Sequence, residues 1–119
     1  MGLFLYNRQW ERNFPKGDTM RIVYGEVGSG KTREILRESQ DTGAVILTDS
    51  LRRKEKLLDK AERYGFKVPT PMVVGEDCIP TDADYIIDNV KTVLEKIFGS
   101  RVQTATLTSG GMNTVVHIN

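Results

Sequence analysis

The feature that most constrains this chain is a glycine-rich segment, residues 25–32, which reads Gly-Glu-Val-Gly-Ser-Gly-Lys-Thr. Residues 20–24, directly before it, are short, apolar and β-branched in the middle, which predicts a strand. Residues 32–40, directly after it, place Ile35 and Leu36 on one face and charged side chains on the other, which predicts an amphipathic helix. A strand, a sharp glycine turn and a helix in this order favour an α/β fold.

The residue types of this segment suit a phosphate group. Gly25, Gly28 and Gly30 permit backbone angles and close approaches that a side chain would block. Successive N–H groups can then point inward as an anion nest, at the positive end of the following helix. Lys31 supplies a mobile charge for the β- and γ-phosphates, and the Thr32 hydroxyl suits a Mg²⁺ ligand. The predicted nucleotide-binding residues are Gly25, Glu26, Val27, Gly28, Ser29, Gly30, Lys31, Thr32 and Arg33.

This segment resembles the Walker A motif of P-loop NTPases, and the resemblance covers only the first third of the chain closely. It implies a three-layer α/β fold, in which a mainly parallel central sheet is flanked by helices. It also implies ATP or another NTP, together with Mg²⁺, as the ligands. The sequence contains no N-K-x-D motif of the kind that reads guanine, which favours ATP.

A second stretch, residues 83–88, reads Ala-Asp-Tyr-Ile-Ile-Asp and resembles the Walker B strand of the same superfamily. The resemblance implies that this strand lies next to the loop strand and that Asp88 reaches the Mg²⁺ through water. The alternative is an ordinary strand-end Asp that caps the next helix. Many hydrolysing members carry Glu after this Asp, whereas this chain has Asn89, whose amide can orient water but cannot take its proton. Asp49, at the end of another predicted strand, is the other candidate base, and its alternative role is an N-cap.

The rest of the chain alternates between strands and helices, as parallel α/β sheets do. We expect strands over residues 44–48, 72–74, 102–108 and 114–118, and helices over residues 51–64 and 90–98. A parallel crossover needs about a dozen residues or more, so the five-residue link at 109–113 favours a hairpin or sharp turn and an antiparallel last strand. Thr108 or Ser109 could present a hydroxyl to the γ-phosphate, as the sensor position of related ATPases does. Thr is also simply a good strand residue.

Length and composition fit one domain with an ordinary soluble composition. We expect residues 20–119 to form a minimal nucleotide-binding domain after an aromatic arm, residues 1–19, that either folds onto the domain or holds a partner or second copy. A net charge of +1 gives no reason to expect nucleic-acid binding. The single Cys78 suits a reducing cytoplasm, and no apolar run approaches the ~20 residues of a membrane span.

Three functions follow from these patterns. The leading one is a Mg²⁺-dependent ATPase with slow or assembly-dependent hydrolysis, in which Arg52, Arg53 or Arg101 would be offered to a neighbouring subunit. The second is a small-molecule kinase in which Asp49 activates an acceptor hydroxyl. The third is a non-hydrolysing structural or regulatory nucleotide-binding protein. By size and motif alone, the chain resembles accessory ATPases of bacteriophages and mobile elements.

Overall fold

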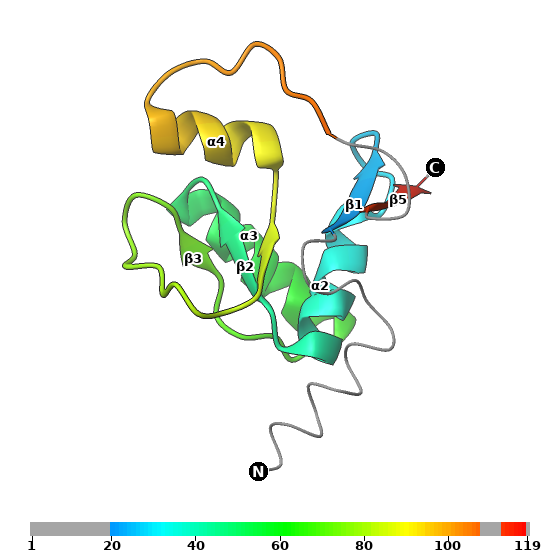
Figure 1. Cartoon of the computed structure of the whole chain (residues 1–119). Coiled ribbons are helices and arrows are strands. Elements are labelled where there is room, and N and C mark those ends of the chain that lie inside the picture. The colour runs from blue at the N-terminus through cyan, green and yellow to red at the C-terminus, as the bar shows by residue number, and fades with distance from the viewer. Residues whose placement is uncertain (1–19, 108–112, 119) are drawn as a thin grey trace. The chain divides into compact units, whose positions relative to one another are not determined.

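The computed structural model describes residues 20–107 and 113–118 (Figure 1). These residues fall into two compact units, one made of residues 20–31, 106–107 and 113–118 and the other of residues 32–105. The aromatic arm, residues 1–19, and the sensor candidates Thr108 and Ser109 lie outside the described residues. Within them, no helix has the length and apolar character needed to cross a membrane. The elements are β1 (Met20–Gly25), α2 (Lys31–Thr42), β2 (Val45–Thr48), α3 (Leu51–Tyr64), β3 (Met72–Val73), β4 (Tyr85–Ile87), α4 (Val90–Phe98) and β5 (Asn113–Ile118).

The first unit is built on two parallel strands, β1 and β5, whose pairing runs from Met20 opposite Asn113 to Gly25 opposite Ile118. Near the carboxyl end of this pair, the rings of Tyr24 and His117 stack with their centroids 4.5 Å apart. The glycine-rich loop leaves the sheet at this end, because β1 ends at Gly25. The pairing with β5 therefore fixes the backbone from which the loop starts.

The second unit contains a three-stranded parallel sheet in the order β3-β2-β4. The carboxyl ends of parallel strands meet at one edge of a sheet, which is where open α/β sheets bind their ligands. Backbone hydrogen bonds continue past the strands at this edge. The Val74 N–H donates to the Thr48 carbonyl at 3.0 Å, and the Asp88 N–H donates to the Leu47 carbonyl at 2.9 Å. The segments that follow β2, β3 and β4 are thus held together.

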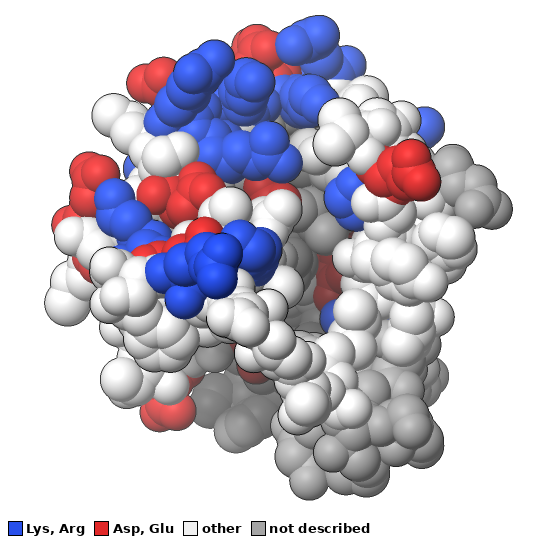
Figure 2. Space-filling view, turned by 90° about the horizontal axis from the view of Figure 1, so that it is seen from above, with Lys and Arg blue, Asp and Glu red and all other residues white. Residues whose placement is uncertain are grey.

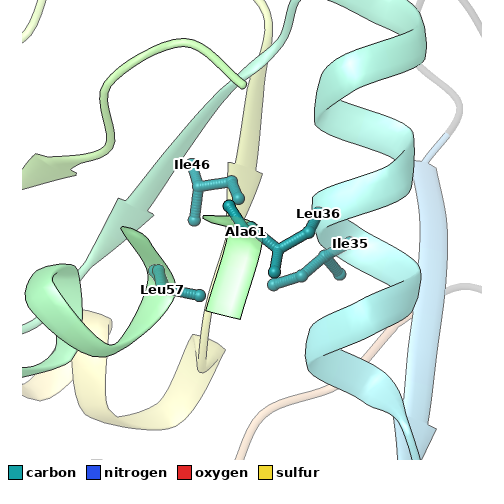
Figure 3. Close-up of a cluster of buried hydrophobic side chains, with 5 residues drawn as sticks. All are labelled: Ile35, Leu36, Ile46, Leu57 and Ala61. Carbon is teal, nitrogen blue, oxygen red and sulfur yellow. The ribbon is translucent and has the colours of Figure 1, made fainter. Parts of the chain in front are cut away.

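The core of this unit has two parts, which lie on opposite faces of β2 because successive strand residues alternate in direction. On one face, Ile46 packs with residues of α2 and α3 (Figure 3). On the other face, Leu47 packs with Val74 and with Val93 of α4. Helices therefore cover both faces of this sheet. The first cluster comprises Ile35, Leu36, Ile46, Leu57 and Ala61.

Helices α3 and α4 begin and end at the predicted residues because both carry clear caps. Ser50 precedes α3, and its hydroxyl accepts a hydrogen bond from the Arg53 N–H at 3.2 Å. Asn89 precedes α4, and its side-chain oxygen accepts from the Lys91 N–H at 3.2 Å. Both helices end at a glycine with positive φ, Gly65 and Gly99. Asp49 is therefore not the cap of α3, which leaves its carboxylate available for another role.

Replacing Ser50 with Ala is expected to lower the free energy of unfolding by about 1 kcal/mol, since the Arg53 N–H loses its acceptor. Asp49→Ala is the matched control, because it changes the neighbouring side chain without removing the cap. Urea denaturation of both variants measures the difference. A larger loss of unfolding free energy for Asp49→Ala than for Ser50→Ala would show that Ser50 is not the residue that caps α3.

Helix α4 leaves more of its predicted apolar face exposed than its sequence suggests. Val93 is buried, whereas Val90, Ile97 and Phe98 are 60%, 58% and 64% exposed. The periodicity predicts the helix correctly, since α4 spans the expected residues. The same periodicity overestimates how many of the apolar side chains of α4 are buried against the second unit.

Three predictions about the sheet are wrong. Residues 102–107 form no strand, and most of them are exposed. Alternating Val and Thr favour a strand only where a neighbouring strand supplies hydrogen bonds, and β1 takes β5 as its partner. The antiparallel last strand is wrong for the same reason, because the short link does not join two strands and β5 runs parallel to β1. The third is the expected position of residues 83–88 beside the loop strand. Among the described strands, β4 is hydrogen-bonded to β2, in a sheet separate from that of β1 and β5.

Candidate phosphate-binding loop

The loop between β1 and α2 turns as its glycines predict. The Ser29 N–H donates to the Glu26 carbonyl at 3.0 Å, which closes a tight turn after β1. Gly28 and Gly30 have φ of +81° and +102°, a region that side chains rarely adopt. Val27, between them and the strand, is fully exposed. The two glycines therefore allow the chain to curl back within a few residues and enter the helix.

Lys31 folds back over the start of this loop. Its Nζ donates to the Gly25 carbonyl at 2.6 Å and to the Glu26 carbonyl at 2.7 Å. An ammonium group has three donors, so two of them tie the charge to the loop and one remains for a further acceptor. The side chain thus holds a positive charge over the same residues that form the turn.

Ser29 lies against the narrowest part of the loop. A Cβ added at Gly25 would overlap the Ile118 carbonyl and would lie 2.6 Å from the Ser29 Oγ. The Oγ itself is buried and has no hydrogen-bond partner among the described residues. A buried polar group without a partner costs free energy, which an acceptor such as a phosphate oxygen would recover. Only glycine fits at position 25, because the nearest atom is the backbone oxygen of Ile118, which cannot move aside as a side chain can.

Asp88 lies at the carboxyl edge of the second unit's sheet, where it forms an ion pair with Arg53 of α3. The Arg53 Nε donates to one carboxylate oxygen at 2.9 Å, and Nη2 lies 3.4 Å from the other. The Asp88 side chain is 12% exposed and that of Arg53 is 40% exposed. The hydrogen bond to Asp88, with the charges of Asp88 and Asp49, raises the pKa of Arg53 despite partial burial. Asp88 is therefore oriented and already partnered by a cation.

The other predicted site residues have identifiable surroundings. Asn89 caps α4 through its side-chain oxygen, and Arg33 places its guanidinium 5.6 Å from the centre of the Tyr64 ring. Asp49 follows β2 at the same sheet edge as Asp88, and it makes no hydrogen bond within the described part of the chain. Of the candidate arginine fingers, Arg53 is engaged by Asp88, while Arg52 and Arg101 are exposed.

The structure thus brings the predicted residues together in two groups. Residues 25–31 form the loop in the first unit, and Asp49, Asp88 and Asn89 follow neighbouring strands of the second. In the described residues, no three His, Cys, Asp or Glu side chains converge as a metal cluster would. Mg²⁺ sites built from one carboxylate, a hydroxyl, water and nucleotide phosphates need no such cluster.

Sequence reasoning missed three features of these groups. It did not predict that Arg53 pairs with Asp88, which is 35 residues away. The signal was available, because both residues follow parallel strands that the α/β alternation makes candidates for neighbours. It also missed the unpartnered hydroxyls of Ser29 and of Thr48, the buried last residue of β2. Burial of this kind depends on packing, so the sequence carries no direct sign of it.

The chain matches no protein-family model, no curated protein and no solved structure.

Proposed function

We propose that this chain is a minimal P-loop protein that binds ATP with Mg²⁺ and hydrolyses it slowly. The observation that carries the proposal is the position of Lys31, whose Nζ is held by the Gly25 and Glu26 carbonyls with one donor left over. A lysine held over a glycine turn at a helix N-terminus is the arrangement that binds the β- and γ-phosphates in P-loop proteins.

Two further features support a phosphate ligand. The Ser29 hydroxyl is buried without a partner among the described residues, so a ligand oxygen would satisfy it. Gly28 and Gly30 keep the loop backbone curled and carry no side chains, which suits the close approach of an anion to the backbone. The proposed fold is the three-layer P-loop arrangement, for which parallel strands and helices on both faces of the β3-β2-β4 sheet are the coarse requirements.

Thr32 and Asp88 remain the predicted magnesium ligands, with Asp88 acting through water. Asp88 fits that role in its own surroundings, because the hydrogen bonds from Arg53 fix the direction of its carboxylate. The positive charge of Arg53 also partly offsets the negative potential at this carboxylate. A carboxylate shared in this way suits an outer-sphere contact with bound water better than direct coordination.

Asp88→Asn is expected to weaken the Mg²⁺-dependent part of ATP binding about tenfold, because the amide keeps the shape but loses the charge that holds metal-bound water. Asp59→Asn is the matched control, since Asp59 is also ion-paired with an arginine, at 2.6 Å from Arg63, but on the exposed surface of α3. Titration of a fluorescent ATP analogue with and without Mg²⁺ measures both. An equal effect of Asp59→Asn, or no effect of Asp88→Asn, would remove Asp88 from the magnesium site.

Slow hydrolysis is proposed because the residue next to Asp88 is committed elsewhere. The Asn89 oxygen accepts the hydrogen bond that begins α4, so orienting a water would compete with the helix cap. Phosphate release from ATP and Mg²⁺, measured over a range of protein concentrations, tests this. Release that rises more than linearly with protein supports an assembly-dependent ATPase, and Arg52→Ala and Arg101→Ala then test for a shared arginine. Tight ATP binding without release favours the non-hydrolysing regulatory protein.

A kinase is the second candidate, and one observation favours it. Ser50 rather than Asp49 caps α3, so the Asp49 carboxylate stands at the carboxyl edge of the sheet without a structural task among the described residues. Such a carboxylate is placed to accept the proton of a hydroxyl substrate. Transfer of labelled γ-phosphate to a panel of nucleosides and other small hydroxyl compounds tests this. The kinase requires transfer that Asp49→Ala abolishes while leaving ATP affinity unchanged.

A further inference from the structure

Helix α3 carries a row of positive charges outside the loop and the Asp88 region. Arg52, Lys56 and Lys60 follow one another at four-residue steps, so they lie along one ridge of the helix about 12 Å long. Arg52 and Lys56 are exposed, and Lys60 is half-buried. Leu57 and Ala61, on the buried side, anchor the helix in the core. The ridge, defined as Arg52, Lys56 and Lys60, is therefore a fixed line of cations on a rigid element.

The ridge is unusual among the charged helix surfaces of this chain. Each of the other two helices contains an ion pair, Arg37 with Glu34 in α2 and Lys91 with Glu95 in α4. Within α3 itself, Arg63 takes Asp59. None of the three ridge side chains has an ion pair or hydrogen bond within the part of the chain that the structure describes. Figure 2 shows Lys and Arg gathered at the top of that view, with acidic side chains at the border, and a second group of cations nearer the centre.

This arrangement costs the helix stability. Like charges at positions i and i+4 repel, and the ridge contains two such steps. The first turn of α3 contains no acidic residue, although the helix dipole favours acids there and disfavours Arg52. The chain's formal net charge is only +1, so the concentration is local rather than a consequence of a basic composition. Departures from local stability rules are expected where a surface serves a ligand.

We propose that the ridge of α3 binds the phosphate backbone of a nucleic acid without reading its base sequence. Exposed, unpaired cations in a line on a rigid helix suit a linear polyanion, and release of its counterions would supply the driving force. A membrane surface fits less well, because Leu57 and Ala61 are buried in the core. The exposed Leu51 and Leu58 lie on the side of α3 opposite the ridge, so cations and apolar side chains do not face one surface together. The proposal does not depend on ATP binding by the loop.

Fluorescence anisotropy with a labelled 30-nucleotide single strand, and with the duplex of the same sequence, tests the proposal on the whole chain. The triple variant Arg52→Gln, Lys56→Gln and Lys60→Gln is compared with a control triple, Arg37→Gln, Lys67→Gln and Lys96→Gln, which loses the same charge from exposed positions elsewhere. The ridge variant is expected to lose about tenfold or more in affinity at 50 mM salt. Its plot of log affinity against log salt should flatten by about two to three units for the duplex, at roughly 0.9 per lost phosphate contact.

The control triple should stay within about threefold of the wild type. It loses the same net charge, which weakens long-range attraction to a polyanion, but it keeps all three cations of the ridge. Thermal melts should show the ridge variant to be as stable as the wild type or more so, since it relieves repulsion. The proposal is overturned if the wild type fails to bind either probe at 50 mM salt, or if both triples lose equally. Equal affinity for poly-glutamate would likewise overturn it, as the ridge would then recognise charge without phosphate. Unchanged ATP affinity in the double variant Lys56→Gln and Lys60→Gln, which keeps the candidate arginine finger Arg52, separates this result from the fate of the loop.

Discussion

Lys31→Ala is expected to weaken ATP binding about 10- to 150-fold, the range for losing one or two charge-assisted hydrogen bonds worth roughly 1.5–3 kcal/mol. The reason lies in how the side chain is held. Its Nζ donates to the Gly25 and Glu26 carbonyls, so its charge is fixed near the loop before any ligand arrives. A pre-positioned cation loses little side-chain entropy on binding, and its removal should cost close to the full interaction.

The measurement is isothermal titration with ATP and Mg²⁺, with Lys67→Ala as the control. Lys67 is exposed and belongs to the second unit, so its loss changes net charge equally without touching the loop. Denaturation of Lys31→Ala should show nearly unchanged stability, because the freed carbonyls belong to half-buried or exposed residues that water can reach. Wild-type affinity in Lys31→Ala would refute the proposed phosphate site and, with it, the ATPase and both alternatives.

The sequence predicts the local parts of this fold well, because their determinants are local. Helices α3 and α4 have the predicted bounds, since Ser50, Asn89, Gly65 and Gly99 are caps that act on adjacent residues. The glycine loop is correct for the same reason, because its turn depends on positive φ at Gly28 and Gly30. Whether this loop holds a nucleotide stays a prediction.

Long-range pairing is where the sequence predictions fail. Residues 102–107 have the composition of a strand but do not form one. A strand needs a hydrogen-bonding partner, and the partner of β1 is the more distant β5. The ion pair of Arg53 with Asp88 has the same origin. In the sequence, Arg53 is a candidate arginine finger and Asp88 a candidate magnesium ligand, with nothing local that links the two. Only the parallel pairing of β2 with β4 makes the two neighbours.

The ridge on α3 illustrates a different limit. A net charge of +1 averages over the chain and gave no reason to expect nucleic-acid binding. In the structure, ion pairs form on all three helices, whereas Arg52, Lys56 and Lys60 of α3 form a row without ion pairs among the described residues. Which charges are neutralised by neighbours depends on helix geometry and rotamers, so composition alone understates the local potential.

The second large effect is expected from Gly25→Ala, which should lower stability by about 1–3 kcal/mol, as overpacking does, and weaken ATP binding more than tenfold. The added Cβ would overlap the Ile118 carbonyl and press on the Ser29 Oγ. Because Ile118 belongs to β5 and pairs with Gly25 itself, the overlap can be relieved only by moving the strands apart. The carbonyl of Gly25 would move with them, and it is one of the two that hold Lys31.

Gly28→Ala is the matched comparison, since a Cβ there meets nothing within 4 Å and the cost comes only from its φ of +81°. That strain is about 1–2 kcal/mol and stays within the loop. Hydrogen exchange of the β5 amides separates the two variants, because Gly25→Ala should reduce their protection and Gly28→Ala should leave it unchanged. If Gly25→Ala kept both the exchange protection of the β5 amides and the ATP affinity of the wild type, Gly25 would not lie as close to β5 as described. If protection fell while ATP affinity held, the β1–β5 pairing would matter to the fold alone, and Lys31 would not need the Gly25 carbonyl to reach a phosphate.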